Sequence, residues 1–406
     1  MSRRSAPLLL AAGSVVSGVL AYVLFALVTR GLGASAAAPV SVLWTAWALA
    51  GAAFTFPLQH WITRSVTAGR AGDVRGSAGR VAAVVVAAAV ATGALAWVFR
   101  DRLFHRDDAW FPALVVLVVL GSAAVGVLRG SLGGRGRMGA VAVSLVAENA
   151  ARCLLVAVLL VAQVRDPVAY GLCLVAGSLI ALWPGTWRFD EGAGAGRGGS
   201  LAFLGGAATA QLLAQGVLSG GAVVLALIGG SPAEITAVFA TLALFRAPYM
   251  VVLGTLPQVT HHVTGLVGAG DLRTLRLLAG RLAVLGTVVV VLGAVIGGTA
   301  GPALVRAVFG DTVEIGHGDA GVIATGCALA LVNVVLMVAA LALDRPGRVA
   351  GAWGLAVLAG AVVLLPTTWL LPVERVAFAF VAAEVAATVL LAVAASSVLR
   401  AGRTTA

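Results

Sequence analysis

Long apolar stretches separated by short polar connections follow one another along the whole chain. A helix needs about 20 apolar residues to cross a bilayer, and the pattern predicts twelve such helices. Their approximate ranges are 7–29, 37–58, 81–99, 110–128, 139–163, 167–184, 201–229, 233–257, 282–305, 319–343, 349–370 and 373–399. The sequence therefore predicts an all-α polytopic membrane protein.

Positive charge is distributed unevenly over the connections between these spans. The 27 basic residues are all arginines, and most of them, Arg129 among them, fall in alternate connections. Loops on the cytoplasmic side of a membrane protein carry the excess of positive charge. We therefore expect both termini to be cytoplasmic, and the longest cytoplasmic connections to lie near 59–80 and 258–281.

These two long connections resemble each other in sequence. Ala71–Arg75 (AGDVR) is echoed by Ala269–Arg273 (AGDLR), and Gly79–Ala82 (GRVA) by Gly280–Ala283 (GRLA). Such echoes predict an internal repeat of two parallel six-helix lobes, although chance similarity between Gly- and Arg-rich loops is the alternative. We expect an N-terminal lobe over 1–190 and a C-terminal lobe over 191–406, around a central cavity that opens to alternate sides.

Composition excludes several classes of protein. Of the residues, 61% are apolar and 11% charged, whereas soluble domains carry about a quarter charged residues. A water-soluble enzyme, a disordered scaffold and a secreted disulfide module are therefore excluded. The net charge of +11 is explained by the arginine-rich cytoplasmic loops, so no nucleic-acid partner is expected.

Catalytic and cofactor motifs are missing from the sequence. Three isolated cysteines and five scattered histidines predict no metal site, and no cofactor is expected. The sequence has no P-loop, HExxH or GxSxG motif, so we expect a protein that is not an enzyme. An integral-membrane transferase is the alternative, but such enzymes gather charged residues in larger loops than these.

Arg246 lies within the eighth predicted span, two residues before Pro248. A charged side chain inside a span costs about 2.5–3.5 kcal/mol on insertion scales, and proline weakens the helix and frees a carbonyl group. Arg246 is therefore a candidate cavity cation that receives an anionic substrate. The alternative is a structural arginine satisfied by helix carbonyls or a neighbouring acid.

Other polar residues repeat at helical spacing. The second span carries small or polar side chains that end at Gln59, and the seventh carries Gln211, Gln215 and Ser219. Either face could line a hydrated pathway, or it could serve close packing between helices. Arg30 closes the first span at the outer surface, where substrate contact and ordinary snorkelling are both open.

Buried acids supply the remaining candidates. Glu148 and Arg152 stand at i and i+4 with the acid first, which predicts a structural ion pair. Glu384 and Asn333 lie at membrane depth without an obvious partner in sequence. A lone buried acid can bind a coupling proton, so Glu384 is the coupling candidate.

Short motifs in three spans resemble those of a known family. Thr29–Gly33 (TRGLG) closes the first span, Leu128–Arg137 (LRGSLGGRGR) and Val146–Arg152 (VAENAAR) surround the start of the fifth, and Leu244–Pro248 (LFRAP) lies in the eighth. In this order along twelve spans, the chain resembles the multidrug/oligosaccharidyl-lipid/polysaccharide (MOP) exporter superfamily. Specifically, it resembles the Wzx-like polysaccharide flippases.

The resemblance implies a function and partners. It implies a flippase of the bacterial plasma membrane, with spans 1, 2, 7 and 8 lining the cavity, that turns polyprenyl-pyrophosphate-linked oligosaccharide from the cytoplasmic to the outer leaflet for cell-surface polysaccharide synthesis. Membrane lipids, a glycan polymerase and glycosyltransferases are the implied partners. The alternatives are an ion-coupled exporter of small molecules or drugs and a membrane scaffold that transports nothing.

Overall fold

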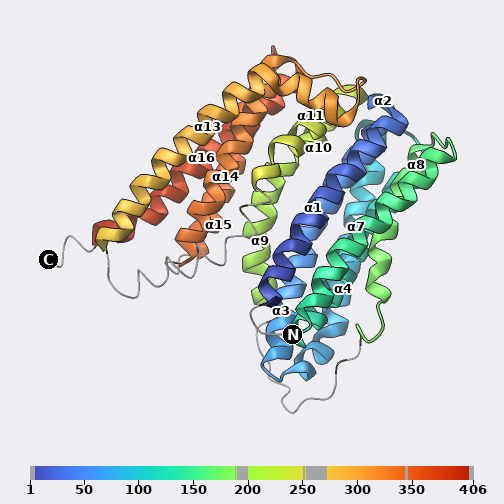
Figure 1. Cartoon of the computed structure of the whole chain (residues 1–406), viewed down its shortest axis with the longest axis vertical. Helices are drawn as coiled ribbons and strands as arrows, with labels where there is room; N and C mark the ends of the chain where they lie inside the picture. Colours follow the sequence, from blue (N-terminus) through green and yellow to red (C-terminus); the bar gives the residue numbers. More distant parts are fainter. Residues whose placement is uncertain are drawn as a thin grey trace. The chain divides into compact units, whose positions relative to one another are not determined.

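The computed structural model describes residues 5–187, 189, 200–249, 252, 272–342 and 346–401, and every regular element within them is helical (Figure 1). The prediction of an all-α polytopic chain is confirmed. The helices are α1 (Ser5–Leu32), α2 (Ala34–Ala50), α3 (Phe56–Thr67), α4 (Ala71–Val98), α5 (Arg100–Leu103), α6 (Trp110–Gly134), α7 (Met138–Val161), α8 (Pro167–Ala176), α9 (Ser200–Ser219), α10 (Gly221–Leu227), α11 (Pro232–Phe245), α13 (Leu272–Phe309), α14 (His317–Ala342), α15 (Pro346–Leu364) and α16 (Pro372–Ala401), with a π-helical turn η1 (Gly51–Thr55) and a 3₁₀ turn η2 (Gly177–Leu182).

Nine helices in the described part of the chain are long and apolar enough to cross a membrane. Two further apolar helical segments, Pro167–Leu182 and Pro232–Phe245, are shorter. Large apolar side chains lie exposed on the outer helices, for example Val90 on α4 and Val284 on α13. Water would disfavour such surfaces, whereas the hydrocarbon of a bilayer accommodates them.

The chain divides into two compact units. Unit 1 comprises Met1–Gln215 with Ser231–Thr236, and unit 2 comprises Gly216–Gly230 with Ala237–Ala406. The lobe boundary predicted at 190/191 lies outside the described residues. The repeated motifs at 257–271 also lie outside them, so that part of the repeat stays a prediction.

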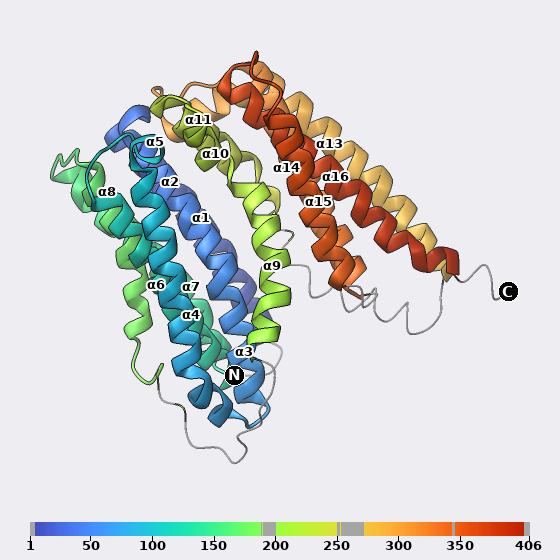
Figure 2. The same cartoon turned by 180° about the vertical axis from the view of Figure 1, so that it is seen from behind.

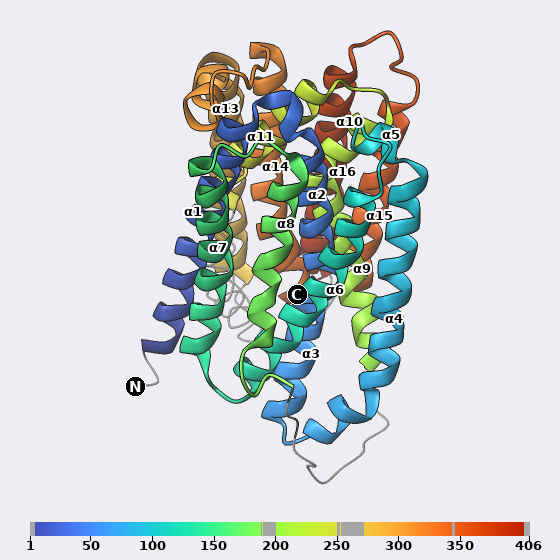
Figure 3. The same ribbon diagram turned by 90° about the vertical axis from the view of Figure 1, so that its right-hand side faces the viewer.

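Unit 1 is built around α6. This helix packs against α2, α3, α4 and α8, while α1 runs along α7 (Figures 1 and 3). Glycines on α6 allow the close approach: a Cβ at Gly126 would lie 2.8 Å from the Thr55 carbonyl oxygen, and one at Gly130 would lie 2.7 Å from the Ile62 Cβ. Small residues at helix contacts are the usual means of packing in membranes, where apolar burial gives no driving force.

Unit 2 is built from α13, α14, α15 and α16. Helix α14 packs against both α13 and α16, and α15 packs along α16 (Figure 2). Gly297 on α13 faces Ala324 on α14. In unit 1 the corresponding pairs in the predicted repeat, α4 with α6, α6 with α8 and α7 with α8, also pack together, and the repeat itself stays a prediction.

The second predicted span is part of one continuous helix that runs from Ala34 to Thr67. As far as Thr55, the polar face of this helix is buried by packing rather than exposed to water. Ser41 and Thr45 are buried and donate to backbone carbonyls one turn earlier, and the Thr55 hydroxyl donates to the Ser122 carbonyl of α6 at 2.7 Å. For these three residues the packing alternative is correct.

The prediction of a long loop near 59–80 is wrong. Helix α3 continues to Thr67, and α4 begins at Ala71. A hydropathy pattern reports which residues lie in hydrocarbon, and a helix that projects beyond the bilayer carries polar residues while keeping its backbone hydrogen bonds. The loop predicted near 258–281 is also too long at its C-terminal end, since α13 begins at Leu272.

Candidate functional site

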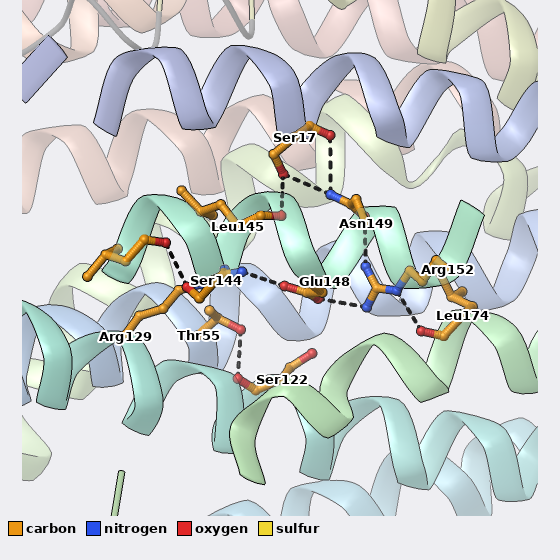
Figure 4. Close-up of polar contacts among 11 residues, drawn as sticks. Ser17, Thr55, Ser122, Arg129, Ser144, Leu145, Glu148, Asn149, Arg152 and Leu174 are labelled. Atoms are coloured by element: carbon orange, nitrogen blue, oxygen red, sulfur yellow. Dashed lines mark hydrogen bonds and ion pairs between the residues drawn. The ribbon is translucent and has the colours of Figure 1, made fainter. Parts of the chain in front are cut away.

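Unit 1 contains a buried group of charged side chains in which Glu148 lies between two arginines (Figure 4). The Arg152 Nη2 atom lies 2.7 Å from Glu148 Oε1, in the pair that the i, i+4 spacing predicts. Arg129 Nη2 donates to Glu148 Oε2 from α6. Glu148 is 4% exposed and Arg152 is fully buried. Two cations and one anion leave one positive charge in this group.

Arg152 is also held by groups from other helices. Its Nε donates to the Leu174 carbonyl of α8 at 2.8 Å, and its Nη1 donates to Asn149 Oδ1 at 3.1 Å. The Trp47 ring of α2 lies 4.6 Å from its guanidinium carbon. Asn149 in turn donates to the Ser17 hydroxyl of α1 at 2.8 Å. The network thus connects α1, α2, α6, α7 and α8 through polar contacts in the membrane interior.

Arg129 corrects a sequence prediction. Its sequence context, rich in glycine and arginine, indicates a cytoplasmic loop, but α6 continues to Gly134 and Arg129 is buried within it. Its Nε also contacts the Ser144 hydroxyl at 3.4 Å. The small residues around Arg129 are typical of a helix that packs closely inside a membrane, and this was the signal that could have identified it.

Arg246 lies in unit 2, in a turn between the end of α11 and the helical residues 247–249. Helix α11 ends at Phe245, three residues before Pro248. Arg246 is 8% exposed. Its Nη1 donates to the Ser219 hydroxyl at 2.8 Å, and its guanidinium carbon lies 5.7 Å from the centre of the Phe239 ring. The structure thus brings the candidate cation to the last member of the polar face predicted on the seventh span.

Glu384 and Asn333 are each other's partner, which sequence alone did not show. Asn333 Nδ2 on α14 donates to Glu384 Oε2 on α16 at 2.7 Å and to the Glu384 carbonyl oxygen at 2.9 Å. Both side chains are fully buried. The Thr388 hydroxyl donates to the same carbonyl at 2.8 Å. The coupling candidate is therefore fixed in place by an amide and buried in unit 2.

Arg246 and Glu384 belong to the same region of unit 2. The Cys327 thiol of α14 lies 3.9 Å from the Leu242 carbonyl oxygen, one turn before Arg246, and α14 also carries Asn333, the partner of Glu384. Within the described residues, neither charge forms an ion pair. Unit 2 thus contains two buried ionisable side chains, one basic and one acidic.

The other predicted site residues lie on α1, α3 and α9. Arg30 is exposed in the last turn of α1, and Gln59 is half-buried in α3. Gln211 and Gln215 are half-buried on α9. Their contact with substrate stays a prediction. Over the described residues, no group of three or more His, Cys, Asp or Glu side chains could hold a metal ion.

Comparison with known proteins rests on structure. Neither the protein-family models nor the curated proteins contain a match to the sequence. An inward-facing structure of a multidrug resistance MATE family transporter of the MOP superfamily has a TM-score of 0.64 at 14% identity, and the match covers 100% of this chain and 97% of that chain. An outward-facing structure of such a transporter has a TM-score of 0.61 at 14% identity, covering 99% and 97%.

A third solved structure is a MOP superfamily transporter from Pyrococcus furiosus whose description reports a binding pocket of reverse polarity. Its TM-score is 0.60 at 13% identity, and the match covers 98% of this chain and 97% of that chain. Such low identities carry no residue-by-residue correspondence, but the matches extend over nearly the full length of both chains. The chain therefore has the fold of the MATE transporters of the MOP superfamily.

Proposed function

We propose that this protein is an ion-coupled exporter of small organic molecules that carry a negative charge. The observation that supports it is the presence of two buried ionisable side chains in unit 2, Arg246 and Glu384, neither of which forms an ion pair within the described residues. A charge inside a membrane protein is costly and is normally paired unless it serves a ligand or an ion. In the proposal, Arg246 binds the anionic group of the substrate and Glu384 binds the coupling ion.

The fold supports a transport role. The structural neighbours include inward-facing and outward-facing forms of multidrug resistance transporters. Parallel lobes in transporters expose a binding site to alternate sides of the membrane by moving against one another. The arginine distribution supports an orientation with both termini in the cytoplasm, and the resemblance to polysaccharide flippases supports a place in the bacterial plasma membrane.

A flippase for polyprenyl-pyrophosphate-linked oligosaccharide is the second candidate, and Arg246 favours it specifically. A pyrophosphate group must cross about 30 Å of hydrocarbon, and a guanidinium group is well suited to bind phosphate oxygens. Outward movement of an anion gains about 2.3 kcal/mol per charge per 100 mV when the cell interior is negative. This candidate therefore needs no coupling ion, and a glycan polymerase and glycosyltransferases would be its partners.

Replacing Arg246 by alanine should reduce transport about tenfold or more, because a charged hydrogen bond is worth about 1.5–3 kcal/mol. The measurement uses purified full-length protein in liposomes. One preparation receives fluorescent organic anions with an imposed pH gradient, and the other receives a fluorescent undecaprenyl-pyrophosphate sugar in one leaflet. Arg306→Ala, which removes an exposed arginine from α13, is the matched control and should transport normally.

The two substrates separate the candidates. Movement of organic anions driven by the pH gradient supports the exporter, and movement of the lipid-linked sugar without a gradient supports the flippase. Full transport by Arg246→Ala would reject Arg246 as the substrate cation in both. A well-folded protein that moves neither class would leave the scaffold role.

A further inference from the structure

Helix α13 contains a proline near its C-terminal end. Pro302 lies within the helix and has no backbone N–H, so the carbonyl group of Gly298, four residues earlier, loses the donor that the helix would otherwise supply. The surface of α13 on both sides of this carbonyl carries exposed apolar side chains, among them Val295 and Leu304. Such a surface suits hydrocarbon, where a carbonyl group without a donor is costly. The Gly298 carbonyl therefore needs a donor from another part of the chain.

The first residue of α14 supplies such a donor. The His317 Nδ1 atom lies 2.9 Å from the Gly298 carbonyl oxygen, which belongs to a residue 19 positions earlier in the chain. A carbonyl oxygen only accepts hydrogen bonds, so Nδ1 must carry the hydrogen in this contact. In the neutral ring, Nε2 is then the nitrogen without a hydrogen. The contact thus assigns one tautomer to His317.

Close packing of α13 and α14 brings this donor within reach. A Cβ at Gly301 of α13 would lie 2.9 Å from the Ala320 Cβ of α14, and one at Gly321 of α14 would lie 3.2 Å from the Gly298 Cα. The two backbones are therefore almost in contact beside the proline. Small residues permit such an approach between membrane helices, and His317, at the start of α14, lies next to this contact.

The hydroxyl group that follows Gly298 in sequence already has another acceptor. Thr299 Oγ1 donates to the Val295 carbonyl oxygen of its own helix at 2.6 Å. Hydroxyl side chains, neighbouring helices and ordered water are the usual sources of donors beside a proline in a membrane helix. Here the donor comes from the neighbouring helix, through an imidazole ring whose apolar body and polar tip suit the edge of a bilayer.

We propose that His317 replaces the hydrogen bond that Pro302 removes from α13. Pro302, Gly298 and His317 then form a joint between the two helices, in which a side chain of α14 completes the backbone of α13. The joint fixes the C-terminal turns of α13 against the start of α14, at a point where a proline would otherwise allow the helix to bend. The inference goes beyond the proposed function, because it gives a conformational role to residues that the transport proposal leaves unassigned.

Melting temperatures of the full-length protein in detergent test the joint by a double-mutant cycle. We expect His317→Ala to lower the melting temperature by about 2 °C or more, because the Gly298 carbonyl loses its donor. Pro302→Ala restores the backbone N–H, so the loss caused by His317→Ala should shrink by about half or more in that background. The matched control is His60→Ala, which removes another exposed histidine, from α3, and should leave the melting temperature unchanged in both backgrounds.

Nitrogen NMR of protein labelled at histidine gives a second readout that does not depend on unfolding. The chain has five histidines, and the joint requires His317 to carry its hydrogen on Nδ1 when the ring is neutral. At alkaline pH we expect a signal of this tautomer in the wild type. The signal should disappear in His317→Ala and persist in His60→Ala.

Three results would overturn the proposal. They are a melting temperature that His317→Ala does not lower, a loss that is equal with and without Pro302, and a wild-type spectrum in which no signal of the Nδ1–H tautomer depends on His317. None of these measurements requires transport. A joint that behaves as expected in a protein that moves no substrate would therefore reject the proposed exporter alone, and failure of the joint would leave the exporter proposal unchanged.

Discussion

Replacing Glu148 by alanine is expected to destabilise the protein by about 3–5 kcal/mol, the range measured when one partner of a buried ion pair is removed. The carboxylate binds Arg152 and Arg129 at the same time, and all three side chains are buried. Without Glu148, two guanidinium groups would remain in the membrane interior with no counter-charge. Chemical unfolding in detergent, followed by tryptophan fluorescence, measures the loss.

The matched control is Glu314→Ala, which removes an exposed acid from the connection between α13 and α14 and should be within about 0.5 kcal/mol of the wild type. Adding Arg129→Met to Glu148→Ala should recover part of the stability, since one uncompensated charge is removed with it. Such non-additivity is expected for residues that share a partner. Equal stability of Glu148→Ala and Glu314→Ala would show that the network does not stabilise unit 1.

The position of this network explains why the protein buries charged groups there. Contacts of Arg152, Asn149 and Arg129 connect five helices of unit 1. Apolar packing alone is a weak source of specificity between helices in lipid, because the tails are as apolar as the side chains. Directed hydrogen bonds fix one arrangement of the helices of unit 1. The network therefore has a structural role, whereas Arg246 and Glu384 carry the proposed transport role.

The sequence was sufficient to predict features that depend on residues close together in the chain. Hydrophobic runs located the membrane helices because each run must cover the bilayer thickness. Glu148 and Arg152 were paired because residues four apart lie on one face of a helix. The helical extensions before Thr67 and after Ala71 were missed, since their polar residues resemble a loop when only hydropathy is considered.

Contacts between helices could not be predicted from the sequence. Arg129 lies 19 residues from Glu148, Ser219 lies 27 from Arg246, and Asn333 lies 51 from Glu384. Each residue is unusual in its own span, and the sequence identified most of them as such. Which polar residue faces which other depends on the rotation of each helix about its axis. Helix packing sets that rotation, and no short motif encodes it.

Gly177→Ala should destabilise the protein by about 1–3 kcal/mol, the usual cost of overpacking a buried contact. Gly177 opens η2 with φ −56° and ψ −31°, which suits alanine, so the backbone is not the obstacle. The obstacle is Arg152: a Cβ at Gly177 would lie 2.7 Å from its Cζ and 2.9 Å from its Cδ. The guanidinium cannot give way without losing its bonds to Glu148 and Leu174.

Gly18→Ala is the matched control, because a Cβ at Gly18 in α1 meets no atom within 4 Å. There the substitution should be neutral or stabilising by up to about 1 kcal/mol, since alanine favours a helix over glycine. The unfolding free energies of both variants are compared with and without Arg152→Met. If Arg152 is the fixed obstacle, the penalty at Gly177 shrinks in that background while the effect at Gly18 is unchanged. A penalty that persists without the guanidinium would place the constraint elsewhere and would show that Arg152 adapts to its neighbours rather than holding them.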